Sequence, residues 1–257
     1  WVLDYYPDRE LSYGGYLYTL KFTQSEVTAY AEIATDVTKS YTSLYSMTND
    51  DGAVLSFNSY NQMLHFFATP SSSRYEAYDG DFEFKVLKLE EDLITLKGKR
   101  SGNVMYLRRL SEDPAQYLQK CVETSENIFI SELSGTIGAN AASAVIDFDI
   151  RYITIVAGAE EAGAYYLPTP TGIRFMSPIE INGGSFSELA FDSEELVFSG
   201  SDSKGNAITL AGELAPDYMK RAEFIGDWTY YYYPSGSQTL KSVDVSLVPI
   251  EGTNDFE

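Results

Sequence analysis

Apolar and polar residues alternate along much of the chain with a period of two, which is the pattern of half-buried β-strands. The alternation is regular in the segments 17–22, 82–86 and 243–247, where every second residue is aliphatic or aromatic. Residues that favour tight turns separate such segments, for example at 50–52 and 204–206. The 21 tyrosines and 14 phenylalanines also fit a pleated sheet surface. The sequence therefore predicts a mostly β protein.

Helical signals are few. Asp113 and Pro114 supply an N-cap and a proline for the first helical position, so a helix is predicted to begin there. The Ala-Pro-Asp sequence at 215–217 predicts a similar start. The segment 58–67 is a third candidate, as one short helix.

Internal repetition divides the chain into related units. The segment 92–107 matches 195–210 in its strand residues and in the turn residues that follow. Repeats of about 100 residues indicate tandem domains rather than a solenoid, whose repeats are about 20–50 residues long. A second match joins the two ends of the chain: Trp1, Tyr5, Tyr6 and Pro7 recur at the same offsets as Trp228, Tyr232, Tyr233 and Pro234.

The order of these matches predicts a first β domain at 1–111, a helical linker at 112–122, a second β domain at 123–223 and the start of a third β unit at 224–257. Each unit is expected to be an antiparallel β-barrel or sandwich, with short helices joining them. Gly-Asp-Trp at 226–228 resembles the G-x-W motif of lipocalin-like barrels, although a tryptophan packed in any β core explains it equally well. We therefore expect tandem, lipocalin-like units.

Charge and cysteine content narrow the function. The chain of 257 residues has 18 basic and 38 acidic side chains, a net charge of −20. This charge repels phosphate backbones and anionic lipid head groups, so nucleic acid is not an expected partner. Cys121 is the single cysteine, which excludes an intramolecular disulfide. A buried apolar role on a helix is favoured over a catalytic nucleophile, because no partner histidine can be assigned to it.

Five sequence segments in the first half of the chain, taken together, resemble those of a known family. They are WVLDYYP, GGYLYTLKF, AVLSFNSYNQMLHFF, DGDFEFKV and LITLKGKRSGNVMYLRRL, and LPTPTGIRFMSPIEI and GDWTYYYY follow later. The chain resembles a Bacteroidetes-type surface lipoprotein family, domain-of-unknown-function family 4302. The resemblance implies a location at the cell outer membrane or cell surface, with a lipid anchor upstream of Trp1. It also implies outer-membrane transport partners in nutrient uptake, and it supplies no catalytic residues.

Two aspartates raise the possibility of hydrolysis. Asp147 and Asp149 are two residues apart on a predicted strand, so they share a face at about 6.5–7 Å. That separation is near the spacing of the two carboxyl groups in inverting glycosidases. Arg151 continues the same face and is expected to pair with Asp149, which favours a solvated surface over a catalytic pair. We therefore predict no catalytic residues.

Two turns of the chain contain candidate metal ligands. Oxygen-rich turns at 49–51 and at Asp79 and Asp81 contain the ligand types that calcium prefers. Hairpin turns capped by aspartate and asparagine side chains explain both better. His65, the single histidine, is expected to be packed among aromatic rings. No metal and no cofactor are predicted.

Aromatic side chains provide the candidate binding residues. The predicted strand 228–233 places Trp228, Tyr230 and Tyr232 on one face. The loop 68–78 is long and polar and contains Tyr75 and Tyr78. Exposed rings of this kind stack on sugars or form the centre of an interface, whereas a fragment of a sheet exposes them without any such role.

The sequence favours a non-enzymatic cell-envelope lipoprotein that binds an extracellular glycan or peptide, accessory to outer-membrane nutrient uptake. A structural, adhesion or assembly protein that uses an aromatic patch is the first alternative. A glycoside hydrolase-like enzyme is the second.

Overall fold

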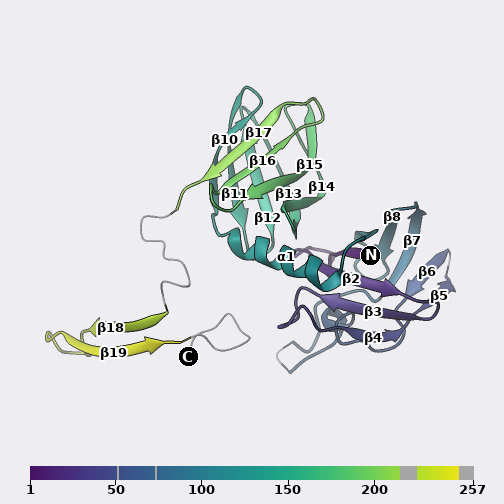
Figure 1. Ribbon diagram of the computed structural model, residues 1–257, viewed down its shortest axis with the longest axis horizontal. Coiled ribbons are helices and arrows are strands. Elements are labelled where there is room, and N and C mark those ends of the chain that lie inside the picture. Colours follow the sequence, from purple (N-terminus) through teal and green to yellow (C-terminus); the bar gives the residue numbers. More distant parts are fainter. Residues whose placement is uncertain (51, 73, 215–224, 249–257) are drawn as a thin grey trace. The chain divides into compact units, whose positions relative to one another are not determined.

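The computed structural model describes residues 1–50, 52–72, 74–214 and 225–248, and Figure 1 shows its elements. Strands account for 51% of the residues and helices for 7%, which confirms the predicted mostly β class. The chain divides into two compact units, Trp1–Glu213 and Leu214–Glu257. The first unit contains two antiparallel sheets and the helix between them.

The first sheet has nine strands and is nearly closed. Its strands are β1 (Val2–Tyr5), β2 (Tyr16–Phe22), β3 (Glu26–Ala31), β4 (Tyr41–Leu44), β5 (Ser46–Asn49), β6 (Ala53–Ser56), β7 (Glu83–Leu89), β8 (Leu93–Gly98) and β9 (Val104–Arg108). The order across the sheet is β4-β3-β2-β1-β9-β8-β7-β6-β5. Only Tyr45 separates β4, which pairs with β3, from β5, which pairs with β6. One continuous segment therefore spans the two ends of the sheet, as in a meander barrel.

The second sheet is a closed barrel. Its strands are β10 (Glu132–Ile137), β11 (Asn140–Asp147), β12 (Tyr152–Ala157), β13 (Glu160–Thr169), β14 (Gly172–Ile181), β15 (Gly184–Asp192), β16 (Val197–Ser201) and β17 (Ala207–Gly212). Each strand pairs with the next in the chain, and β10 closes the ring on β17. In β11, Ala142, Ala144 and Ile146 are buried while the residues between them are exposed. This period of two places the aliphatic residues inside the barrel.

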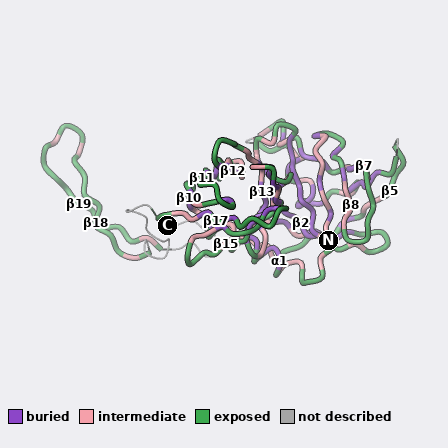
Figure 2. The backbone as a smooth tube through the Cα atoms, turned by 90° about the horizontal axis from the view of Figure 1, so that it is seen from above, coloured by how far each residue is buried: buried purple, intermediate pink, exposed green. Residues whose placement is uncertain are grey.

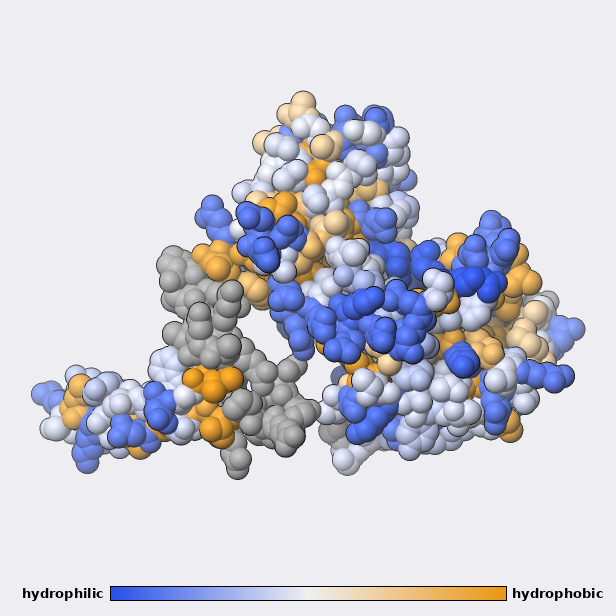
Figure 3. Space-filling model, viewed as in Figure 1, coloured by the Kyte–Doolittle hydropathy of each residue, from blue (hydrophilic) through white to orange (hydrophobic). Residues whose placement is uncertain are grey.

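A helix, α1 (Pro114–Asn127), lies between the two sheets (Figure 1) and packs against β2, β3 and β13. Asp113 accepts a hydrogen bond from the backbone N–H of Gln116 at 3.0 Å, and Pro114 follows as the first helical residue. This confirms the predicted helix start, and the helix extends beyond the predicted linker. Tyr117, Leu118 and Cys121 are its buried residues, whereas hydrophilic side chains cover its outer side (Figure 3).

The strand β2 is buried on both faces in its middle part, from Leu17 to Leu20. The alternation in the sequence predicted only one buried face. Tyr18 and Leu20 face the interior of the first sheet, where the ring of Tyr18 packs edge-on against that of Tyr5 at 5.3 Å. Leu17 and Thr19 lie on the other face, and the Thr19 hydroxyl donates to the carbonyl oxygen of Pro114 at 3.4 Å. The helix therefore completes the core of the first sheet from outside.

Buried ion pairs join the first sheet to the second barrel. Asp4 of β1 is 3% exposed and accepts hydrogen bonds from Arg108 of β9, at 2.8 Å, and from Arg174 of β14. Burial alone lowers the pKa of the Arg174 guanidinium, but the charge of Asp4 and its hydrogen bonds outweigh this and raise that pKa above its ordinary value. Arg174 is therefore a permanent cation in the junction.

A second ion pair lies nearby in the same junction. Arg151 Nη2 is 2.6 Å from Glu32 Oε1, and Arg151 also donates to the carbonyl oxygen of Gly15 at 2.9 Å. Gly14 has a φ of +65°, and a Cβ at this position would overlap the carbonyl of Ile150. Glycine is therefore required here for the backbones to approach so closely.

The second unit contains a hairpin of β18 (Gly226–Tyr232) and β19 (Lys241–Leu247). Cross-strand pairing places Trp228 beside Val245 and Tyr230 beside Val243, so one face of the hairpin is apolar. Asp227, Thr229, Ser242, Asp244 and Ser246 lie with Tyr231 on the other face. Most residues of both strands are exposed (Figure 2).

The other two predicted helices are not seen in the described residues. The segment 58–67 forms turns that lead into a short 3-10 helix, Phe66–Ala68, so the prediction of one helix there is wrong. The side chain of Asn61 explains the difference, because its Oδ1 accepts from the backbone N–H of Met63 at 3.0 Å and competes with helical hydrogen bonds. The helix start predicted at 215–217 lies outside the described residues.

The junction leads to the first prediction. Replacing Asp4 with asparagine leaves the Arg174 guanidinium buried without its counter-charge. We expect the free energy of unfolding to fall by about 3 kcal/mol, measured by urea denaturation. The exposed pair of Asp92 with Arg109 gives the control, since D92N is expected to leave stability near that of the unmodified protein. Equal stability of the two variants would contradict the importance of the buried pair.

Candidate functional site

A groove of about 800 Å³ lies beside β4 in the first unit, and we call it the aromatic groove. It is formed by the connection from β3 to β4 and by the longer connection from β6 to β7. Its lining residues are Ile33, Ala34, Thr35, Asp36, Lys39, Ser40, Tyr41, Tyr60, Gln62, Met63, Phe66, Thr69, Pro70, Ser71 and Tyr78.

Asn61 attaches the longer connection to the sheet. Its side chain is fully buried, and its Nδ2 lies 3.1 Å from both the carbonyl oxygen of Tyr41 and the hydroxyl oxygen of Ser43, which accept from it. Buried polar groups with satisfied partners fix the geometry around them. One wall of the groove is therefore held to β4 by a specific amide.

Four aromatic side chains line the groove: Tyr41, Tyr60, Phe66 and Tyr78. The rings of Phe66 and Tyr78 are nearly parallel, with their centroids 5.8 Å apart and an interplanar angle of 16°. Tyr60 lies against His65, and His65 stacks on Phe82 with a centroid distance of 5.0 Å. The exposed rings are thus supported from beneath by other rings.

The backbone around Tyr78 is strained. Ala77 and Asp79 have φ values of +60° and +56°, in the left-handed region that residues other than glycine rarely adopt. Gly80 follows, and a Cβ on it would come within 2.5 Å of the Cβ of Phe67. Such strain persists only where the surrounding structure determines it, and it is common at binding sites. Here the two residues that flank Tyr78 adopt this conformation, and the Tyr78 ring itself is held between Phe66, Phe67 and the Arg74 guanidinium.

Charge in the groove is balanced. The carboxylate of Asp36 and the ammonium of Lys39 are 3.5 Å apart. Hydrogen bonds from the side chain and backbone of Thr38 lower the pKa of Asp36, so it is ionised at neutral pH. The remaining polar lining consists of hydroxyl and amide groups, from Thr35, Ser40, Gln62, Thr69 and Ser71.

The structure separates the residues predicted to bind a ligand. Tyr78 lines the aromatic groove, whereas Tyr75, from the same loop, is 80% exposed and is not among the lining residues. Trp228, Tyr230 and Tyr232 lie on the apolar face of the hairpin in the second unit, where Tyr230 and Tyr232 stack at 5.9 Å.

The other groove rings, Tyr41, Tyr60 and Phe66, were not among the residues predicted from the sequence. Tyr41 is the first residue of β4, whereas Tyr60 and Phe66 lie in the connection from β6 to β7, in the segment 58–67 that was predicted to be a helix. Only their aromatic character signals a site, because this connection has no regular period. The hydrogen bonds of Asn61 to Tyr41 and Ser43 join this connection to β4.

The arrangement of the two candidate catalytic aspartates is different from the prediction. The strand β11 ends at Asp147, and Asp149 lies in the turn that follows, where its backbone N–H donates to the Asp147 carboxylate at 3.0 Å. Arg151 pairs with Glu32 rather than with Asp149, so the predicted ion pair is wrong. The turn replaces the expected continuous strand because the Asp147 side chain caps it, and Arg151 has a φ of +51°.

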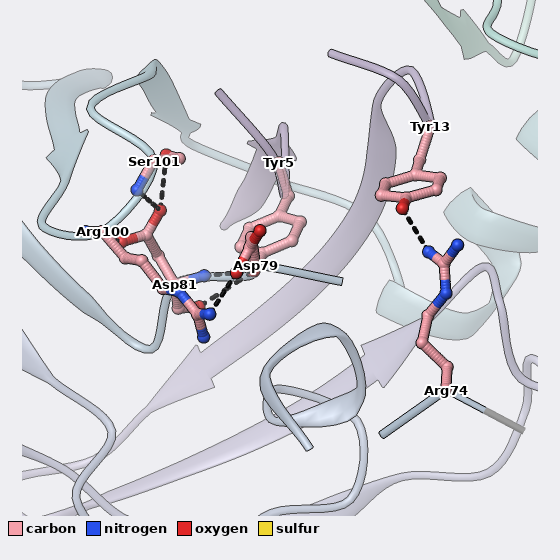
Figure 4. A network of polar contacts seen from close by, with 7 residues as sticks. All are labelled: Tyr5, Tyr13, Arg74, Asp79, Asp81, Arg100 and Ser101. Carbon is pink, nitrogen blue, oxygen red and sulfur yellow. Dashed lines mark hydrogen bonds and ion pairs between the residues drawn. The ribbon is translucent and has the colours of Figure 1, made fainter. Parts of the chain in front are cut away.

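The candidate calcium turns are engaged in other contacts. Asp79 pairs with Arg100, and the buried carboxylate of Asp81 accepts from the Ser101 hydroxyl at 2.5 Å (Figure 4). The Tyr5 hydroxyl lies 3.0 Å from the carbonyl oxygen of Asp81 and donates to it. Asp50 pairs with Lys99 at 3.0 Å, and Asp51 lies outside the described residues. Within the described residues, no cluster of three or more His, Cys, Asp or Glu side chains forms a metal site.

His65 is packed between rings as predicted, and its Nδ1 lies 3.1 Å from the Asn61 carbonyl oxygen. Burial lowers its pKa, so the ring is neutral at neutral pH. Arg74 sits over the rings of Tyr13 and Tyr78 and donates to the Tyr13 hydroxyl (Figure 4). Both residues stabilise the aromatic walls around the groove.

Comparison with known proteins gives a match over most of the chain. Residues 1–193 match the family described as a domain of unknown function, DUF4302. This match covers the whole of the first sheet, α1, and the second barrel as far as β15 and one residue beyond it. No curated protein and no solved structure matches the chain. None of the helices in the described residues has the length and hydropathy of a membrane span.

The environment of Cys121 generates the second prediction. The thiol is buried on α1, and burial raises its pKa to about 12. Since the thiolate is the reacting species, native protein at about pH 8 is expected to react negligibly with a disulfide reagent such as DTNB. The same reagent should label one thiol per chain in urea, and C121S gives the blank. Rapid stoichiometric labelling of native protein would show that Cys121 is a reactive thiol.

Proposed function

The chain belongs to the DUF4302 family, and we propose that it is a non-enzymatic cell-envelope protein that binds an extracellular glycan or peptide in the aromatic groove. In this proposal it serves as an accessory to outer-membrane nutrient uptake. The location and the transport partners come from the resemblance to surface lipoproteins. The binding role comes from the groove itself.

The single observation that supports binding is the lining of the groove. A cavity of about 800 Å³ has the size of a small-molecule site, and such sites combine ring surfaces with a few polar groups. Four rings with hydroxyl and amide groups provide that combination. They are carried by connections that are fixed to a β scaffold, which is the usual placement of binding residues.

The ionisable groups support binding rather than catalysis. In the groove lining, the charged side chains are Asp36 and Lys39, which pair with each other. General acid–base chemistry requires groups that are matched to a substrate and poised near the working pH. The pKa of Asp36 is instead lowered by its hydrogen bonds, which favours a permanently ionised structural group.

The hairpin favours a second candidate function, a structural or assembly role. Trp228 and Tyr230 on its apolar face are 36% and 60% exposed. Aromatic rings on an exposed sheet face are common at the centres of protein interfaces. In this alternative, W228S combined with Y230S abolishes association with a partner and leaves ligand binding unchanged.

Two exposed tyrosines provide a matched test of the binding proposal. Tyr60 lines the groove and is 67% exposed, whereas Tyr75 does not line it and is 80% exposed. Oligosaccharides and peptides are screened by thermal shift, and affinities of the hits are measured by calorimetry. We expect Y60A to weaken binding about fivefold, since one ring contributes about 1 kcal/mol. Y75A should bind as the unmodified protein does.

Equal affinity of Y60A and the unmodified protein for every ligand found would place the binding site outside the aromatic groove. Y60F retains the ring and is expected to bind nearly as well as the unmodified protein. This variant separates loss of the ring surface from loss of the hydroxyl group.

A further inference from the structure

We infer that the ligand of the aromatic groove is an uncharged oligosaccharide, an inference that rests on the proposed function and narrows its ligand class. Three features of the groove point to this chemistry. They are its charge balance, the combination of rings with hydroxyl and amide groups, and the Asn61 side chain on the sheet edge beside it.

The charge balance of the groove contrasts with the rest of the chain. The net charge of the protein is −20, yet the charged residues of the lining are one carboxylate and one ammonium that pair at 3.5 Å. An anionic ligand would meet the repulsion of the whole chain and find the ammonium of Lys39 already paired. A cationic ligand would likewise find the Asp36 carboxylate paired. An uncharged ligand disturbs neither group.

The rings and polar groups suit a sugar. One face of a pyranose ring presents C–H groups that pack on an aromatic ring, while its hydroxyl groups need hydrogen-bond partners at the edge. Tyr41, Tyr60 and Phe66 are exposed flat surfaces in the groove. Exposed hydroxyl and amide groups line the same groove, on Thr35, Ser40 and Gln62. The volume of about 800 Å³ accommodates more than one sugar ring.

The sheet edge beside the groove argues against an extended peptide. Proteins commonly capture such peptides by adding them as a strand to an open sheet edge, through backbone hydrogen bonds. On β4, the carbonyl oxygen of Tyr41 already accepts from Asn61 Nδ2 at 3.1 Å, and Ser43 is buried beneath the same amide. A peptide strand would have to displace this buried side chain. The groove therefore offers side-chain surfaces rather than a backbone edge.

The experiment compares three classes of probe by titration calorimetry with the full chain. The neutral probes are hexasaccharides of α-linked glucose, β-linked glucose, xylose and mannose. The charged sugar probe is hexagalacturonate, and the peptide probes are hexapeptides of neutral, acidic and basic composition. Each is tested to about 5 mM, because affinities in the millimolar range still correspond to about −4 kcal/mol.

We expect at least one neutral hexasaccharide to bind and hexagalacturonate not to bind. Affinity for the neutral sugar should change less than twofold between about 0.05 and 0.5 M NaCl, since screening has little effect on an uncharged ligand. Y60A and F66A should each weaken it about fivefold or more, while Y75A leaves it within twofold. Y60F, which keeps the ring, should restore most of the affinity.

Other results would overturn the inference in distinguishable ways. Binding of a peptide or of hexagalacturonate that is lost in Y60A, without binding of any neutral sugar, contradicts the sugar assignment and leaves the groove as a binding site. Binding of a neutral sugar that is unchanged in Y60A and F66A contradicts the site. Failure of all probes to bind overturns both the inference and the proposed function.

Discussion

The buried carboxylate of Asp4 is the contact on which the arrangement of the first unit depends. It lies on β1 and pairs with Arg108 of β9 within its own sheet and with Arg174 of β14 in the second barrel. Asp4 is buried, the Arg174 side chain is 15% exposed and that of Arg108 is 35% exposed. A buried carboxylate of this kind is tolerated only when its charge and hydrogen bonds are satisfied. Apolar contacts alone would permit many relative positions of two barrels. The ion pairs select one, and Glu32 with Arg151 reinforces it.

The junction and the aromatic groove lie on different strands of the first sheet. There, β1 and β2 are covered on their outer face by α1 and the junction, so that region is not available to a ligand. β4 and β5 are the two end strands of the sheet order, where β4 pairs with β3 and β5 pairs with β6. The connection 57–82 crosses this region and is held by Asn61. The irregular part of the barrel is thus the part that is free to carry binding residues.

Sequence patterns predicted the parts that depend on local periodicity. The strands, the helix start at Asp113 and the tandem units follow from alternation, capping and repeats. Asp4 and Arg174 are 170 positions apart in the sequence, and no local sequence pattern predicts a contact between them. Arg151 was assigned to Asp149 because a continuous strand was expected. The groove was only partly predicted, through Tyr78. Tyr60 and Phe66 lie on a connection without a regular period, and this connection meets Tyr41 of β4 only in the folded chain.

The sequence that begins at Trp1 recurs at Trp228, but the two copies differ in how far their side chains are buried. Leu3 and Tyr5 correspond to Tyr230 and Tyr232 by the offset of the matching Trp1 and Trp228. In the first sheet, Leu3 faces Tyr18 and is 1% exposed, whereas Tyr230 in the hairpin faces Val243 and is 60% exposed. An isolated two-stranded hairpin is marginally stable, because it buries little apolar surface. The face that contains Leu3 is part of a core in the first unit, whereas the corresponding face of the hairpin is exposed. Burial of this face would therefore stabilise the hairpin most.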